Sequence, residues 1–501
     1  MRTTLALACG LVALGPVSAR AQAPGAGALV IRGGTVIDGT GREPRVGIVV
    51  ARGGRIECVG AEQDCPVPSG ARVVDASGRF VLPGLIDTHV HLYWSTDSAG
   101  SRQTQALRFG LGITTVREAG TAEQLQANLA RRPIAAAAER AEPKLVVAGL
   151  LKADGPPLID QVRNLAALGV DAIKVKDPLP PTELIDATDE AHRLGLSVFG
   201  HMIVGEPPLF PGPDAPEAYD GVSHLQSIAP AAIVDPSVLP PKPAESDDIA
   251  VQRTWFKTLW LAADSTALAE RIGALRERGS WLEPLLVTEE FFILHPKLDQ
   301  ALVDYAHFNP VRRRLREAEL HRIRPKQQER LDSSLARARA FVLAFHRAGG
   351  MLLAGTDNSP IPGFSLHGEL AALVAAGLTP SEALAAATRN AARAFGMEDS
   401  LGTLEAGKRA DLVVLDADPL VDIRNTVRVW RVVKGGVVHD PAPLLAALRA
   451  EGQAMSPAAL AAARAAGRAK KLIAAGVATS LAIGLFLGLL RRRRADPGDG
   501  S

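Results

Sequence analysis

Short apolar runs rich in β-branched residues, separated by glycine pairs, occur in two distant parts of the chain. They lie at 29–81, which includes LVIRGGTVIDG and VGIVVARGGRIECVG, and at 402–438, which includes VRVWRVVKGGVVHD. This pattern is typical of strands and hairpins. Because the same texture flanks a long middle region of different character, we expect one small β-sandwich built from residues 29–82 and 398–440.

The middle region, residues 83–397, alternates short apolar runs with longer stretches of helical period. Such alternation predicts βα units and a parallel sheet. Eight strands are expected, at Leu85–His91, Ile113–Arg117, Leu145–Ala148, Ala172–Val175, Ser197–His201, Val222–His224, Leu282–Val287 and Met351–Gly355. Eight strands close a barrel, so the predicted fold class is α/β, a (β/α)8 TIM-like barrel beside the composite β-sandwich. Long insertions before and after the seventh strand are expected to shape substrate access.

The first 21 residues predict export. Met1-Arg2 is followed by an apolar stretch, Leu5 to Val17, and then by the small-residue segment Ala19-Arg20-Ala21. A charged start, a short apolar middle and a small-residue end are the features of a secretory signal peptide. We therefore expect residues 1–21 to be a signal peptide and the body of the chain to lie outside the cytoplasm, in the periplasm or on the extracytoplasmic face of the membrane.

The other end of the chain predicts a membrane anchor. Residues 472–490 are uncharged and span about 28 Å as a helix, close to the hydrocarbon thickness of a bilayer. Four arginines at 491–494 follow, as on a cytoplasmic flank. We expect a helical connector at 441–471, a C-terminal transmembrane helix at 472–490 and a cytoplasmic tail at 491–501. Small residues at every fourth position of this helix predict a weak homo-oligomer through Gly476, Ser480, Gly484 and Gly488.

Composition excludes several functions. Lys and Arg number 56 and Asp and Glu number 54, so the net charge of +2 gives no attraction to nucleic acid through the chain as a whole. Three cysteines are too few for a disulfide scaffold or a zinc-ribbon cluster. Cys58 and Cys65 lie close together, and both a disulfide and two free thiols remain open.

The residues that indicate chemistry stand at the ends of expected strands. Asp87-Thr88-His89-Val90-His91 closes the first strand, and residues i and i+2 of a strand share one face, so both imidazoles can address one point. His201, His224 and Asp357 close later strands. The carboxyl ends of barrel strands converge on one mouth, and imidazole and carboxylate suit zinc and similar ions. The sequence therefore predicts a metal site at this mouth.

Lys174, at the end of DAIKV, does not fit this pattern as an ammonium, because an ammonium has no lone pair to offer a cation. A buried lysine beside metals can lose its proton, and the neutral amine can react with carbon dioxide to form an anionic carbamate that bridges two ions. Two alternatives stay open. Lys174 could instead pair with a nearby carboxylate, and Lys176, which has the same strand phase, is a rival for the bridging role.

These motifs resemble the metal-dependent amidohydrolase superfamily, most closely its imidazolonepropionase-like and Xaa-Pro-dipeptidase-like branch. The resemblance covers about Leu29 to Asp440, and it implies a (β/α)8 barrel with a β-sandwich assembled from both flanks. The matching pieces are VLPGLIDTHVH at 81–91, GITTVREAG at 112–120, GVDAIKVK at 169–176, MLLAGTD at 351–357 and the long run at 366–420.

The resemblance also implies a role for each site residue. His89 and His91 match the ligands of a buried metal, Lys174 matches a carboxylated bridging lysine, and His201 and His224 match the ligands of a second, more exposed metal. Asp357 matches a metal-bound carboxylate that shuttles protons. Glu118 departs from the pattern, because the family usually has Asp there.

The implied activity is hydrolysis of an amide or peptide-like C–N bond in a small amide or dipeptide. Two divalent ions would hold a bridging hydroxide, with zinc the first candidate and manganese, cobalt and iron still open. Asp357 would act as general base and then general acid. Tyr93 and His367 are candidates for substrate contact. Burial against an insertion remains the alternative for Tyr93, and a structural role remains the alternative for His367.

Two other functions remain as alternatives. One is a mononuclear cyclic amidohydrolase that uses His89, His91, His201 and Asp357, with Lys174 merely structural. The other is a non-catalytic binding protein on a degenerate barrel. The loss of a ligand would indicate such a barrel, but all six positions are filled in this chain.

Overall fold

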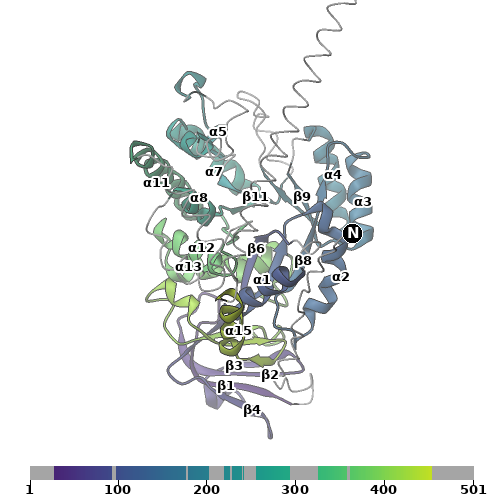
Figure 1. Ribbon diagram of the computed structural model, residues 1–501, viewed down its shortest axis with the longest axis vertical. Helices are drawn as coiled ribbons and strands as arrows, with labels where there is room; N and C mark the ends of the chain where they lie inside the picture. The colour runs from purple at the N-terminus through teal and green to yellow at the C-terminus, as the bar shows by residue number, and fades with distance from the viewer. Residues whose placement is uncertain are drawn as a thin grey trace, which may run out of the picture.

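A computed structural model describes most of the chain (Figure 1). The described residues are 27–92, 98–176, 179–201, 219–225, 228–239, 241, 255–293, 325–357 and 361–453.

A parallel sheet of seven strands forms the barrel, in the order β12-β11-β10-β9-β8-β7-β6. Each strand is short and almost wholly buried, as expected for strands covered on both faces. Consecutive strands are neighbours, so the carboxyl ends of all seven lie at one end of the barrel. The strands are β6 (Leu85–Val90), β7 (Ile113–Glu118), β8 (Lys144–Leu151), β9 (Ala172–Val175), β10 (Ser197–Gly200), β11 (Gly221–Ser223) and β12 (Trp281–Glu283).

The eighth expected strand closes the barrel through single bridges instead of a regular ladder. Leu352 bridges Leu282 of β12, and Asp357 bridges Val90 of β6, both in parallel. Backbone hydrogen bonds join this segment to both neighbours, including Leu353 N–H to the Leu282 carbonyl at 2.9 Å and Thr88 N–H to the Ala354 carbonyl at 3.0 Å. The predicted barrel is therefore confirmed in its order and direction, with seven regular strands rather than eight.

The seventh strand is shorter than expected. The apolar run Leu282–Val287 predicted one strand, but β12 ends at Glu283 and helix α8 begins at Leu286. Leu285 has a φ of 53°, in the left-handed region that side chains with a Cβ seldom adopt, so the chain turns there. Two buried elements of different type share this run, and hydrophobicity alone cannot divide it.

Helices surround the barrel and lie outside its strands (Figure 1). Helix α3 illustrates the local rules, since Leu158, Val162 and Leu165 place one apolar face against the sheet and the helix stops at Gly169, whose φ is 81°. The α-helices among the described residues are α1 (Ser98–Gly110), α2 (Leu125–Ala136), α3 (Leu158–Leu168), α4 (Pro181–Arg193), α5 (Ile228–Ala231), α7 (Ser265–Glu277), α8 (Leu286–Ile293), α11 (Pro325–Arg347), α12 (Phe364–Ala375), α13 (Pro380–Ala386), α14 (Arg389–Ala394) and α15 (Pro441–Gln453).

A second sheet contains strands from both flanks of the barrel sequence, as predicted. Its order is β15-β14-β13-β5-β1-β2-β3, with β4 paired to β1. The two flanks meet where β5 pairs with β13 in antiparallel fashion. Its strands are β1 (Leu29–Val36), β2 (Arg45–Arg52), β3 (Arg55–Gly60), β4 (Arg72–Asp75), β5 (Phe80–Pro83), β13 (Leu412–Leu415), β14 (Val429–Lys434) and β15 (Val437–His439).

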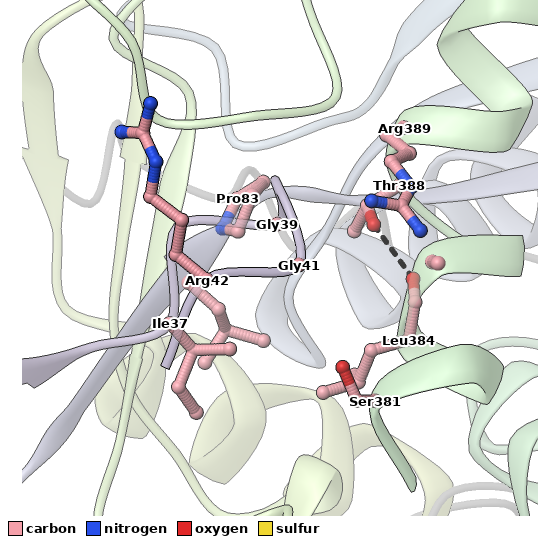
Figure 2. A pocket seen from close by; sticks show the side chains of 11 residues that line it. Ile37, Gly39, Gly41, Arg42, Pro83, Ser381, Leu384, Thr388 and Arg389 are labelled. Atoms are coloured by element: carbon pink, nitrogen blue, oxygen red, sulfur yellow. Dashed lines mark hydrogen bonds between the residues drawn. The ribbon is translucent and has the colours of Figure 1, made fainter. Parts of the chain in front are cut away.

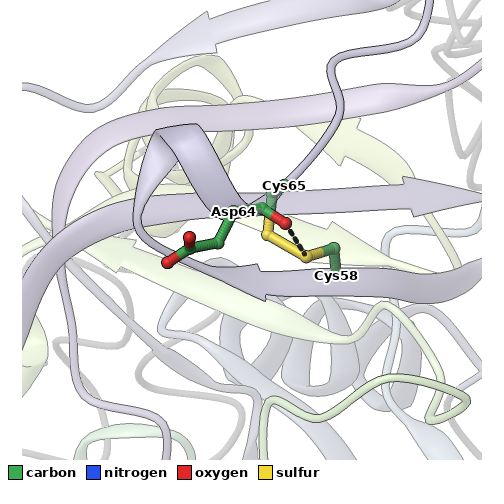
Figure 3. The surroundings of a disulfide bond; sticks show 3 residues. All are labelled: Cys58, Asp64 and Cys65. Atoms are coloured by element: carbon green, nitrogen blue, oxygen red, sulfur yellow. Dashed lines mark hydrogen bonds between the residues drawn. A yellow bond between two sulfur atoms is a disulfide. The ribbon is translucent and has the colours of Figure 1, made fainter.

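Cys58 and Cys65 form a disulfide at the edge of this second sheet (Figure 3). Cys58 lies on β3, and Cys65 follows the short 3₁₀ turn Glu62–Asp64. Cys65 is buried, with 1% of its surface exposed, and packs against Val30, Ile48 and Val50. Of the two alternatives that the sequence left open, the structure contains the disulfide.

A pocket lies where the loops of the second sheet meet α13 and α14 (Figure 2). Its floor is apolar, and the guanidinium of Arg389 is held at its rim by a 2.7 Å hydrogen bond to the Thr40 carbonyl. Leu82 and Pro83, which line it, come just before β6, at the amino-terminal end of that strand. The pocket is therefore at the opposite end of the barrel from the strand-end histidines and is not the candidate site.

The predicted localisation requires correction. Within the ranges that the structure describes, none of the helices is long and apolar enough to cross a membrane. The described residues therefore give no support to an exported chain anchored by a C-terminal transmembrane helix. The expected signal peptide at 1–21, the expected membrane helix at 472–490 and its stripe of small residues all lie outside the described residues.

The expected connector after residue 440 is a helix that packs back on the barrel. Helix α15 lies beside α1, and Leu445 and Leu448 join the apolar cluster of Leu107 and Leu111 (Figure 1). Only residues 441–453 of the predicted connector are described.

Candidate metal centre

His89 and His91 project from the end of β6 toward the barrel axis. Their ring centroids are 5.5 Å apart. Nε2 of His91 lies 3.2 Å from Oδ1 of Asp357, and Nε2 of His89 lies 3.9 Å from the same oxygen. One ligand atom from each of these three residues lies within 4.8 Å of the other two, so the three can share one ion.

Asp357 is brought to the histidines by an unusual backbone. Its φ is 53°, and its N–H donates to the His89 carbonyl at 2.7 Å. Close approach of the two segments requires Gly355, since a Cβ there would lie 2.7 Å from the Cβ of His89. Left-handed backbone at a residue other than glycine is often retained at functional sites.

His201 and His224 lie beside this pair and extend it. The ring centroids of His201 and His224 are 4.6 Å apart, and those of His224 and His89 are 5.1 Å apart. His224 also has a positive φ, of 68°. Four imidazoles from β6 and from the ends of β10 and β11 therefore form one continuous cluster with Asp357.

Lys174 completes the set from β9. It is 1% exposed, and its Nζ lies 4.7 Å from the centre of the Phe199 ring. Gly120 permits this position, because a Cβ there would lie 2.9 Å from the Cβ of Lys174. Lys176, by contrast, lies beyond the end of β9 and is exposed. The structure therefore separates the two lysines that strand phase alone could not.

The electrostatics favour the neutral form of three of these imidazoles. Burial, with a further contribution from Lys174, holds the pKa of His89 and of His201 well below the usual value. Burial lowers the pKa of His224 to about 4. Burial by itself would raise the pKa of Asp357, but the hydrogen bond with His91 and the neighbouring imidazoles hold it well below its ordinary range. Neutral imidazoles and a carboxylate are the forms that bind metal ions.

Three buried polar atoms of this cluster have no hydrogen-bond partner among the described residues. They are Nε2 of His89, Nδ1 of His224 and Nζ of Lys174. Buried polar groups are nearly always paired, so these three atoms are available to bind a ligand. Imidazole nitrogens and a carboxylate oxygen around a shared point fit a divalent metal.

Two carboxylates to which the sequence analysis gave no role in the site, Glu283 and Glu118, support the first-strand histidines. Nδ1 of His89 lies 2.7 Å from Oε2 of Glu283. Nδ1 of His91 lies 2.9 Å from the hydroxyl of Thr121, and that hydroxyl hydrogen bonds to Glu118. Two sequence features could have identified these carboxylates. Glu283 ends the apolar strand WLE, and Glu118 replaces the aspartate that the family usually has.

The structure describes only one of the two residues predicted to contact substrate. Tyr93 lies outside the described residues. His367 is buried on α12, its Nε2 donates to the Leu111 carbonyl at 3.0 Å, and its Nδ1 lies 2.9 Å from the Thr426 hydroxyl. Leu111 precedes β7 at the amino-terminal end of that strand, so these contacts favour the structural role for His367.

Comparisons with known proteins agree with this geometry. Residues 251–481 match the family model described as the amidohydrolase family. An imidazolonepropionase of Symbiobacterium thermophilum is 29% identical over 399 residues, which cover 74% of this chain and 83% of that protein.

Solved structures share the fold. A Xaa-Pro dipeptidase with bound methionine has a TM-score of 0.59 at 19% identity, over 82% of this chain and 100% of that one. Bottromycin amidohydrolase has a TM-score of 0.61 at 23% identity, over 86% of this chain and 92% of that one. At these identities the likeness shows the fold alone.

Proposed function

We propose that the chain uses two divalent metal ions to hydrolyse an amide or peptide-like C–N bond of a small molecule. It belongs to the amidohydrolase superfamily, in the imidazolonepropionase-like and Xaa-Pro-dipeptidase-like branch. The observation that carries this proposal is the convergence of four histidines, a buried lysine and a carboxylate at one end of the barrel. Nε2 of His89, Nδ1 of His224 and Nζ of Lys174 have no hydrogen-bond partner among the described residues, and ligand atoms of His89, His91 and Asp357 lie within 4.8 Å of one another.

Each residue has a stated part in this proposal. His89 and His91 would hold one ion, His201 and His224 would hold a second, and Lys174 would supply an anionic ligand as a carbamate. When bound, such ions polarise a carbonyl oxygen and lower the pKa of a shared water, with zinc the first candidate. Asp357 accepts a proton from the attacking water and passes it to the leaving nitrogen, as a base and then an acid.

The mononuclear alternative makes Lys174 merely structural, paired with a carboxylate. Nζ of Lys174 has no hydrogen-bond partner among the described residues. Burial lowers the pKa of Lys174 to about 7, so a large fraction of the amine is neutral at physiological pH. The nitrogen lone pair can then attack the carbon of carbon dioxide, and loss of one proton leaves an anionic carbamate. These observations support the two-metal form.

The activity is tested by a substrate screen on the purified chain with added metal. The panel contains cyclic amides, dipeptides and N-acyl amino acids, because the similar proteins named above include an imidazolonepropionase and a Xaa-Pro dipeptidase. We expect hydrolysis of at least one class, loss of activity with a chelator and recovery with a divalent ion. Elemental analysis should give about two ions per chain. Metal binding without any hydrolysis would instead favour the non-catalytic alternative.

Replacing Lys174 with alanine should lower kcat/KM by at least about 100-fold, because an anionic ligand inside the site is lost. Short carboxylic acids such as acetate or propionate should partly restore activity, since a free carboxylate can occupy the space of the carbamate. Lys176→Ala is the matched control, as Lys176 is exposed two residues further along and should keep full activity. Equal losses in both variants, or no loss in Lys174→Ala, would reject the carbamate.

Reconstitution of the metal-free enzyme should depend on pH and on bicarbonate. With a pKa of about 7, Lys174 is about 90% neutral at pH 8 and about 10% neutral at pH 6. Carbamate formation needs the neutral amine, so uptake of metal should be favoured as pH rises through 7. The bicarbonate requirement should disappear in Lys174→Ala rescued by acetate. A wild-type enzyme that reconstitutes equally well without carbon dioxide would contradict this prediction.

A further inference from the structure

We propose that Glu283 is a positioning residue that fixes the tautomer of His89, with the proton on Nδ1 and the lone pair on Nε2. The inference deepens the proposed metal-dependent function and rests on it for the role of His89. It assigns a role to a buried carboxylate at the end of β12 that is not itself among the six proposed ligands.

Three side-chain donors converge on this carboxylate. Nδ1 of His89 lies 2.7 Å from Oε2, and the hydroxyl of Ser223 donates to the same oxygen at 2.7 Å. Nη2 of Arg117 donates to Oε1 at 2.8 Å. The side chains of Glu283, His89 and Arg117 are each 0% exposed, so bulk solvent does not reach this arrangement. An ionised carboxylate accepts hydrogen bonds and donates none, so it selects the N–H form at Nδ1 of His89.

Arg117 offsets the free-energy cost of burying the Glu283 carboxylate and fixes the position of that carboxylate. Its Nε donates to the Thr88 carbonyl at 2.8 Å, and its guanidinium lies 3.6 Å from the centre of the Phe199 ring. Thr88 is adjacent to His89 in the chain, so Arg117 joins the backbone of β6 to the carboxylate that holds the His89 ring. A buried charge that is paired and hydrogen bonded is stable, whereas an isolated one is not.

The main chain of Glu283 extends its influence to a second histidine. The N–H of His224 donates to the Glu283 carbonyl at 2.9 Å, next to the positive φ of His224. Glu283 therefore contacts the ring of one proposed ligand and the backbone of another, from a strand that supplies no ligand itself. Partners of this kind set the orientation and basicity of metal-binding imidazoles.

The substitution Glu283→Gln separates this role from simple space filling. Glutamine has the same shape, but its amide must point NH₂ either at Arg117 or at His89 and Ser223. An NH₂ group facing His89 favours the tautomer with Nδ1 as acceptor and the proton on Nε2, which removes the lone pair from the cluster. An NH₂ group facing Arg117 would keep the amide oxygen on His89, but it would place two donors against each other at 2.8 Å. This clash disfavours the second orientation, so we expect the orientation that changes the His89 tautomer.

The first measurement uses metal-free protein labelled with ¹⁵N at histidine. In the wild type we expect the His89 signal, identified by its absence in His89→Gln, to show the proton on Nδ1. In Glu283→Gln we expect that signal to move toward the other tautomer. A wild-type His89 with its proton on Nε2 would overturn the proposal, whether or not any variant folds.

The second measurement is metal affinity, determined by competition with a chelator. Loss of such a partner typically weakens binding by about 10–100-fold, and we expect this range for Glu283→Gln. The matched control is Glu369→Gln, because Glu369 is equally buried but accepts from the backbone N–H groups of Leu286 and Val287. Unchanged affinity in Glu283→Gln, or an equal loss in both variants, would overturn the proposal.

The outcomes distinguish this inference from the proposed function. A wild-type chain that takes up no divalent ion refutes the metal-dependent function, while the tautomer of His89 in the same metal-free protein still tests Glu283. A wild-type chain that binds two ions and hydrolyses substrate, with Glu283→Gln indistinguishable from it in tautomer and affinity, refutes only the role of Glu283.

Discussion

Replacing both His89 and His91 with alanine should abolish metal binding at the first position and reduce hydrolysis to background. These two imidazoles and Asp357 hold their ligand atoms within 4.8 Å of one another, and alanine leaves only the carboxylate. The affinity should fall well beyond the roughly 100-fold that loss of an outer partner causes. Elemental analysis of the purified variant, together with its rate on the substrate found in the screen, measures both effects.

A control variant separates loss of ligands from loss of histidine in general. His192→Ala removes a half-exposed imidazole of α4 that contacts Asp220 at 2.9 Å, away from the strand ends. It should keep wild-type metal content and rate. Metal content in the double variant equal to that of the wild type would refute the assignment of His89 and His91.

The sequence predicted that these polar residues cluster because of where they stand along the chain. A histidine or aspartate that ends an apolar run in an alternating α/β pattern must lie at the carboxyl end of a strand, and those ends meet in a barrel. His89, His201, His224 and Asp357 are all found in one cluster for this reason. To predict that these side chains cluster, only the order and direction of the strands had to be correct.

The choice between Lys174 and Lys176 was beyond the sequence. Residues two apart on a strand share a face, so the pattern gives both the same direction. The strand ends at Val175, and Lys176 therefore emerges into solvent while Lys174 stays inside. A strand end depends on hydrogen bonds to neighbouring strands, which one-dimensional periodicity does not contain.

The supporting residues were missed for a related reason. Glu283 ends a strand of three residues inside an apolar run that predicted a longer strand, so its position at the mouth was hidden. Its partner Arg117 lies 166 positions away in the sequence. Such contacts follow from three-dimensional packing between strands that are neither consecutive nor similar in pattern.

The same limit applies to the left-handed backbone at the site. Three residues that come after the sixth, seventh and eighth strand positions of the barrel have a positive φ, although none is glycine. They are His224, Leu285 and Asp357. Glycine is the main sequence signal for positive φ, and without it the sequence analysis did not predict this backbone at the three positions. Tertiary hydrogen bonds such as Asp357 N–H to the His89 carbonyl hold the backbone there.

Replacing Asp357 with asparagine should lower kcat by about 10²–10⁴-fold, the usual contribution of a positioned acid–base group. The amide keeps the size of the side chain, and asparagine tolerates the φ of 53° about as well as aspartate does, so the backbone bond to His89 should survive. The amide cannot accept and return a proton, and it has lost the charge of the carboxylate. KM should change far less than kcat, because the proton transfer rather than substrate binding is removed.

Asp220→Asn is the matched control for this substitution. Asp220 precedes β11 at the opposite end of the barrel, where its carboxylate accepts from the Val198 N–H at 2.7 Å. This variant should keep the wild-type kcat even if its thermal stability falls. Steady-state kinetics on both variants, with metal content measured in the same samples, tests the role of Asp357. A kcat within tenfold of wild type in a fully metallated Asp357→Asn enzyme would mean that another group moves the proton, and Asp357 would then be a ligand alone.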